Sequence, residues 1–154
     1  MKVKYYEDEI IKNEKSIVLC GPTPRDDKTP SWRPNAIKIL EDLKFDGTVY
    51  IPEYKTGLKC NNYNEQVNWE REVYLNCTII IFWIPRHFPD MLGLTTNVEF
   101  GYWIKSKKCI YGRPDYAERI RYLDWLYYIE YNKKPHNDLK ELLQESIKLA
   151  NSSV

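Results

Sequence analysis

The sequence has few of the residues on which many catalytic and metal sites depend. It contains only two histidines, His87 and His136, and neither joins a Cys/His or Ser/His/Asp pattern. No Walker loop, no GxGxxG motif and no cluster with metal-ligand spacing occurs. We therefore expect neither a metal ion nor a cofactor, and we interpret both histidines as exposed loop residues.

Long apolar runs and an excess of one charge are also missing. No stretch approaches the roughly 18 apolar residues of a membrane helix, and residues 1–16 mix charges in a way that no signal peptide does. The 23 Lys and Arg nearly balance the 22 Asp and Glu, which leaves a net charge of +1. These absences predict a cytoplasmic protein that binds neither nucleic acid nor membrane.

Cysteine is present without a disulfide or metal pattern. The four cysteines, Cys20, Cys60, Cys77 and Cys109, show no CxxC spacing, and three of them begin or end apolar runs. We expect buried free thiols in a reducing compartment rather than disulfides.

What the sequence does have is an alternation of apolar runs with helical patterns, typical of a parallel sheet covered by helices. Strands are expected at Ser16–Cys20, Thr48–Ile51, Thr78–Ile84 and Lys108–Tyr111. The third lacks an alternation of polar and apolar residues, so it should be a central strand buried on both faces. The prediction is one α/β domain over residues 1–154: a flavodoxin-like or Rossmann-like three-layer sandwich with a mostly parallel sheet of four or five strands, flanked by helices.

Helix boundaries are expected at residues that favour them. Pro34 suits a first helical turn, and a second helix should run from about Glu65 to Asn76. Thr95 or Thr96 is expected to cap a third helix, and Asn137 to cap the last one.

Ligands of such sheets bind beyond the carboxyl ends of the strands. Three loops qualify: Gly21–Pro34, the segment after Ile51, and Pro85–Thr96. Glu99 follows the last of them near an expected helix start, where the helix dipole stabilises an anion by about 0.3–1 kcal/mol. Acidic residues are common in first helical turns, so this spacing alone does not identify Glu99 as catalytic.

Five strings contain a more specific signal. SIVLCGPTPR, SWRPNAI, QVNWE, IIIFWIPR and LTTNVEFG follow one another within roughly residues 16–125. Together they resemble one branch of the nucleoside 2-deoxyribosyltransferase family. LTTNVEFG followed by KKCIYG is similar to the nucleophile element of that family, so the resemblance implies that Glu99 is the catalytic nucleophile.

The resemblance implies a two-step displacement at the anomeric carbon of a deoxynucleoside or nucleotide. Glu99 would expel the base and form a covalent glutamyl-sugar intermediate, which a second base or water would then resolve. A transferase and an N-glycosidase that hydrolyses a deoxynucleoside monophosphate or another nucleotide both fit. A non-catalytic nucleotide-binding module is a third hypothesis, because folds of this class support many functions.

Two carboxylates are candidates for moving the proton. Asp90 lies in the loop before Glu99, as an Asp does in better-known members, although the gap here is longer and needs an insertion. Glu70 lies near where another carboxylate of the family approaches the leaving base. Each can instead be a solvated surface charge.

Further residues are candidates for substrate binding. Gly21, Pro22 and Thr23 follow the first strand, where the family's glycine lets backbone approach the substrate; a plain turn is the alternative. Asn97 can hold sugar hydroxyls or cap the helix. Trp32 and Trp83 can stack on a base, although the position of Trp83 in a buried strand favours core packing.

Three loop arginines remain open in role. Arg25, Arg33 and Arg86 can bind a 5′-phosphate or a base bidentately. They can also merely pair with nearby carboxylates, namely Asp26, Asp27 and Asp90.

Assembly is the last expectation. The resemblance implies homo-oligomers in which a neighbour helps to close each active site. Segment Tyr116–Tyr131 is dense in Tyr, Trp and Leu, and Tyr and Trp are enriched in interfaces. We expect part of it to form an interface, most simply in a two-fold dimer; packing of these rings on the last helix is the alternative.

Overall fold

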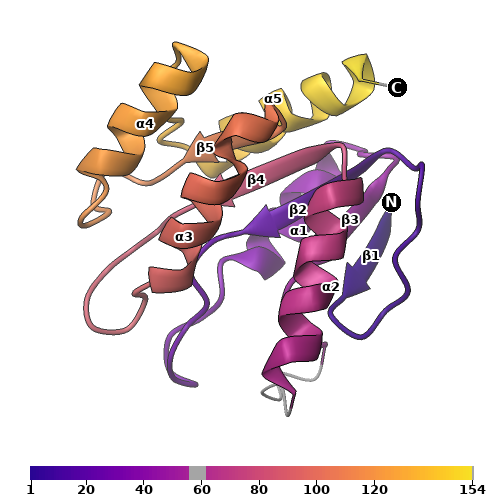
Figure 1. The fold of residues 1–154 in the computed structure, drawn as a ribbon, viewed down its shortest axis with the longest axis horizontal. Helices are drawn as coiled ribbons and strands as arrows, with labels where there is room; N and C mark the ends of the chain where they lie inside the picture. Colours follow the sequence, from indigo (N-terminus) through magenta and orange to yellow (C-terminus); the bar gives the residue numbers. More distant parts are fainter. Residues whose placement is uncertain (56–61, 154) are drawn as a thin grey trace.

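The computed structural model describes residues 1–55 and 62–153, which form five strands and five α-helices (Figure 1). In chain order these are β1 (Lys2–Tyr5), β2 (Ser16–Cys20), α1 (Arg33–Asp42), β3 (Thr48–Ile51), α2 (Tyr63–Asn76), β4 (Ile79–Trp83), α3 (Leu94–Trp103), β5 (Cys109–Gly112), α4 (Arg121–Tyr131) and α5 (Leu139–Ser152). A short 3₁₀ turn, Ile104–Ser106, extends α3. None of the helices in the described ranges is long and apolar enough to cross a membrane.

The strands form one parallel sheet in the order β1-β3-β2-β4-β5, which confirms the flavodoxin-like α/β prediction. The four expected strands are present. Two have the expected bounds, and the ends of the other two are each shifted by one residue. The first strand, KVKY, was not expected, because its alternating lysines are typical of a solvated segment. It pairs only with β3 as an edge strand, where lysines are favoured.

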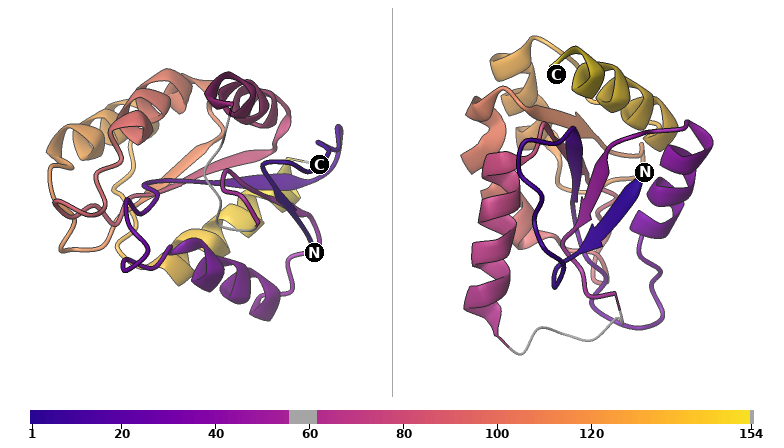
Figure 2. Two further views of the ribbon diagram at one scale, coloured as in Figure 1. Left: turned by 90° about the horizontal axis from the view of Figure 1, so that it is seen from below. Right: turned by 90° about the vertical axis from the view of Figure 1, so that its right-hand side faces the viewer.

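Helices cover both faces of the sheet (Figure 2). One core contains the inward side chains of α1 and α5, and the other those of α2, α3 and α4. All five residues of β4 are buried, as predicted for a strand covered on both faces. Cys20, Cys77 and Cys109 are buried free thiols, as expected, whereas Cys60 lies outside the described residues.

The sheet order changes direction between β2 and β4. From β2 the chain crosses to β3 on one side, whereas β5 follows β4 on the other. Cys20 pairs with Phe82 near the carboxyl ends of the two strands. The loops after β2 and β4 therefore diverge at the switch point where ligands of such sheets bind.

Two expected helix caps are wrong. Helix α3 starts after Gly93, whose φ of 61° is left-handed, and Thr95 and Thr96 lie inside the helix. A Cβ on Gly93 would lie 2.5 Å from Cγ of Pro22, so only glycine permits this close approach of the two loops. Helix α5 is capped by Asp138, whose carboxylate accepts from the Glu141 amide, rather than by Asn137.

Candidate active site

Glu99 lies on α3 and faces Tyr74 of α2 across the end of β2. The Tyr74 hydroxyl donates a hydrogen bond of 3.0 Å to Oε1 of Glu99. Tyr74 is 3% exposed, and its ring packs edge-on against Trp103 with centroids 5.4 Å apart. The Cys20 thiol, at the end of β2, also interacts with the Tyr74 hydroxyl. Tyr74 was not predicted as a site residue, since a tyrosine on a helix gives no sign of a distant carboxylate partner.

Burial dominates the electrostatics of Glu99. It raises the pKa of the carboxyl to about 7, and the Glu70 carboxylate raises it further by repulsion. The Tyr74 hydrogen bond and the Arg33 guanidinium act in the opposite direction. The helix dipole therefore stabilises the Glu99 anion less than its expected place near a helix start predicted. Glu99 lies in the second turn of α3, beyond the reach of the free amides, and desolvation outweighs the dipole.

Glu70 is the carboxyl group coupled to Glu99. It lies on α2, where Gln66 Nε2 donates to its Oε1 at 2.9 Å. Burial raises its pKa as well, and the Gln66 hydrogen bond and Arg33 oppose that rise. Two coupled carboxyls with raised pKa values hold one proton between them over an intermediate pH range. Such a pair supplies one acid and one anion.

Arg33 is buried and bound to the protein itself. Its Nε donates to Leu19 O at 3.0 Å, its Nη2 to Gly21 O at 2.8 Å and its Nη1 to Thr23 Oγ1 at 3.2 Å. Its ion-pair partner is Glu53, after β3, and not Asp26, Asp27 or Asp90.

Glu53 was not predicted, because the pair joins the start of α1 to the loop after β3, 20 residues away in sequence. Asp26 instead accepts from the backbone amides of Lys28 and Thr29 within its own loop.

Arg86 is buried in the same way after β4. Its Nε donates to Leu92 O at 2.6 Å, its Nη1 to Arg119 O at 3.0 Å and its Nη2 to Gly93 O at 3.2 Å. Nη2 also donates to Oδ1 of Asn97. The Asn97 side chain, expected near the sugar or at the helix end, thus binds Arg86 within the first turn of α3.

The glycine and tryptophans of this edge pack against the protein. A Cβ on Gly21 would lie 2.1 Å from the Trp83 carbonyl oxygen, so glycine is required for the approach of β2 to β4. Trp32 is 8% exposed, and its indole N–H donates to Pro22 O at 3.2 Å. Trp83 lies in the core, as its strand position indicates.

The remaining predicted residues, Thr23, Arg25 and Asp90, lie on the loops after β2 and β4. Thr23 and Arg25 are exposed, and the Arg25 amide donates to Asp90 O at 3.1 Å, which joins the loops after β2 and β4. Asp90 is half-buried. The groups that act on the pKa of Glu99 are Glu70, Tyr74 and Arg33, so within the described chain Glu70 is coupled to Glu99 more directly than Asp90 is.

Neither histidine is the exposed loop residue that we expected. Both are half-buried. His87 Nδ1 lies 3.3 Å from Pro85 O, and the His136 backbone bonds to Tyr111 and Arg113 beside β5. Burial lowers the pKa of His136.

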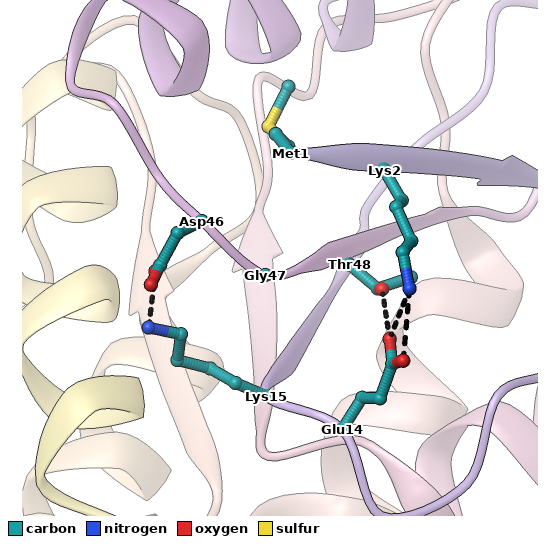
Figure 3. Close-up of a pocket in the computed structure, with 7 residues that line it drawn as sticks. All are labelled: Met1, Lys2, Glu14, Lys15, Asp46, Gly47 and Thr48. Atoms are coloured by element: carbon teal, nitrogen blue, oxygen red, sulfur yellow. Dashed lines mark hydrogen bonds and ion pairs between the residues drawn. The ribbon is translucent and has the colours of Figure 1, made fainter.

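Two surface hollows lie away from Glu99. One, of about 310 Å³, lies at the amino edge of the sheet (Figure 3). Its charges pair with one another, Lys2 with Glu14 at 3.0 Å and Lys15 with Asp46. The other, of about 550 Å³, lies beside α4 between Arg113 and Asn137. Parallel α/β sheets bind ligands at their carboxyl edge. Glu70 and Glu99 at that edge are therefore a better candidate site than the hollow at the amino edge, whose charges already pair with one another.

Comparison with known proteins assigns the chain to a family. A family model described as "Nucleoside 2-deoxyribosyltransferase like" matches residues 14–116. No curated protein matches the sequence. The matched region runs from just before β2 to just after β5, and it includes Arg33, Glu70, Tyr74, Arg86 and Glu99. With most of its length matched, the chain belongs to the nucleoside 2-deoxyribosyltransferase-like family.

Proposed function

We propose that this protein is a pentosyl-transferring enzyme that cleaves the N-glycosidic bond of a deoxynucleoside and passes the sugar to another base. The observation that supports this best is the pair Glu99 and Glu70, two coupled carboxyls with raised pKa values at the carboxyl edge of the sheet. Cleavage of a glycosidic bond with a covalent intermediate needs one carboxylate to attack and one acid to protonate the leaving group.

In the first step Glu99 attacks C1′ of the sugar. Tyr74 binds Oε1, which leaves Oε2 as the attacking oxygen. The bond from C1′ to the base breaks, its electron pair stays with the base nitrogen, and Glu70 donates the proton that neutralises the base. The reactive form has the proton on Glu70 and the negative charge on Glu99. Burial and the Glu70 charge both oppose that form by raising the Glu99 pKa, and the Tyr74 hydrogen bond partly offsets them by stabilising the Glu99 anion.

In the second step an acceptor base attacks C1′ and Glu99 leaves as a carboxylate, while Glu70 takes up the acceptor's proton. Tyr74 stabilises the charge that returns to Glu99. Water in place of the base gives hydrolysis by the same groups, which is the second candidate function. It is supported by the partial exposure of Glu99, which leaves a route for water. Asp90 is the alternative acid, on the loop before α3.

We propose an uncharged nucleoside rather than a 5′-phosphate as the substrate. Two of the three edge arginines, Arg33 and Arg86, are buried and donate to the protein's own acceptors. A substrate phosphate would have to displace those bonds, and at Arg33 it would also lie near the carboxylates of Glu53, Glu70 and Glu99. Of the three guanidinium groups, only that of Arg25 has no partner among the described residues. Of the three arginines, Arg25 is therefore the one that could bind a phosphate without breaking such bonds.

The test is product analysis by chromatography. The protein is incubated with deoxyinosine, with and without adenine, and in parallel with dAMP. Deoxyadenosine formed only when adenine is present supports transfer, whereas free hypoxanthine without adenine supports hydrolysis. Faster turnover of dAMP that is lost in Arg25→Gln would contradict the uncharged substrate. No product from any substrate, with Glu99→Gln as the blank, would favour a non-catalytic binding module.

A further inference from the structure

The start of helix α3 depends on a side chain from outside the helix. Its N-cap, Gly93, has no side chain to satisfy the free amides, and the φ of 61° turns the chain sharply at that point. The Arg86 guanidinium fills this corner and donates to Leu92 O, Gly93 O and Asn97 Oδ1. One buried group therefore joins the last two residues of the loop to the first turn of the helix.

Arg86 and Tyr74 hold α3 from nearly opposite sides. Asn97 and Glu99 are two residues apart on a helix with 3.6 residues per turn, so their side chains point about 200° apart. Arg86 binds the first and Tyr74 binds the second. A helix held at two opposite points cannot rotate about its axis without breaking one contact.

Arg86 is itself fixed by the segment before α4. The Glu118 amide donates to Arg86 O at 3.0 Å, and Glu118 Oε1 accepts from the Phe88 amide at 2.9 Å. Arg119 O accepts from Nη1 of Arg86. Glu118 and Arg119 come after residue 116, where the family match ends, so the arrangement combines a family element with a segment outside it.

We propose that Arg86 is a positioning residue, which sets the rotation of α3 and so aims Glu99 at the sugar, rather than a ligand of the substrate. This inference rests on the proposed function. A reacting group displaced by about 1 Å can cost roughly 100-fold in rate, so the geometry of α3 bears directly on turnover.

The test compares Arg86→Lys with Arg113→Lys, the same change at an arginine paired with Asp124 beside β5. An ammonium group cannot reproduce the planar fork that reaches four acceptors. For Arg86→Lys we expect kcat to fall about 10- to 100-fold with KM within about threefold. In ¹³C-glutamate NMR, the Glu99 carboxyl should titrate at higher pH than in the wild type, because the Tyr74 bond is weakened. Arg113→Lys should leave kcat and this titration unchanged.

A second variant covers the case in which Arg86→Lys fails to fold. Asn97→Ala removes one contact from an exposed helix position, and we expect the same direction of change in kcat and in the Glu99 titration. A KM raised more than tenfold with unchanged kcat and titration would make Arg86 a substrate ligand and overturn the proposal. Wild-type titration of Glu99 in both variants would also overturn it. If the wild type shows no turnover, the proposed function fails, and the NMR titration still decides the role of Arg86.

Discussion

The Tyr74 hydroxyl and Oε1 of Glu99 lie 3.0 Å apart, which places a phenol donor from α2 directly on the proposed nucleophile of α3. Burial and the Glu99 and Glu70 charges keep the Tyr74 pKa far above its usual range, so the phenol stays protonated and can only donate to the carboxylate. A donor of this kind stabilises the ionised form of Glu99 and partly offsets its burial.

Glu99→Gln should abolish turnover and leave the fold intact. The amide oxygen can still accept from Tyr74, but it cannot form the sugar ester, so we expect a loss of at least about 1,000-fold in kcat. Rates measured by chromatography, with circular dichroism as the folding check, test this. A variant that keeps a tenth of the wild-type rate would contradict the assignment. Mass spectrometry after incubation with a 2′-fluorinated nucleoside should find the adduct on Glu99, and an adduct elsewhere would move the nucleophile to that residue.

The same variant should change how stability depends on pH. The pKa of Glu99 is about 7 in the folded protein against 4.5 for an unperturbed carboxyl, so between these values the folded state binds more protons than the unfolded state. The free energy of unfolding therefore falls as pH rises through this window, by at most about 3 kcal/mol from this group. Urea unfolding at pH 5 and pH 8 should show Glu99→Gln gaining stability relative to the wild type at pH 8. An equal difference at both pH values would argue against the raised pKa.

Tyr74→Phe should move the acid limb of the pH–rate profile to higher pH. Without the phenol donor the Glu99 anion loses a stabilising contact, so its pKa rises above about 7 and a higher pH is needed to ionise it. The pH dependence of kcat/KM reports this shift. Tyr131→Phe is the control, because that hydroxyl accepts from the Cys109 amide away from Glu99. An unchanged limb in Tyr74→Phe would mean that the hydrogen bond does not act on the ionised form.

Self-association stays a prediction, to which the structure adds a defined surface. Helix α4 buries Leu123 and Tyr127, whereas Tyr122, Trp125 and Tyr128 are each more than half exposed. Rings of this kind are enriched at interfaces. Light scattering at micromolar concentration should report a mass of at least two chains, and Trp125→Glu should lower it if α4 lies in the interface. A clean monomer that still exchanges bases would show that no neighbour is needed.

Local patterns in the sequence determined four of the sheet's five strands and the family. Ile79–Trp83 is apolar throughout, so only a strand buried on both faces suits it, and the loops that follow the predicted strands had to meet at one edge. The strings around Gly21, Arg33, Arg86 and Glu99 lie within the region that the family model matches. These properties depend on residues close together in the chain, which is why they could be predicted before the structure.

Only the tertiary structure decided the chemistry at each position. The Tyr74 and Glu99 contact spans 25 residues and the Arg33 and Glu53 pair spans 20, and no local pattern encodes either. Whether Glu99 is anionic depends on how deeply α2 buries it, a desolvation effect that opposes the helix dipole inferred from its position. Arg33 and Arg86 look like ligands for a phosphate in the sequence. Packing directs them instead to backbone carbonyls, because a buried guanidinium must find acceptors within the protein.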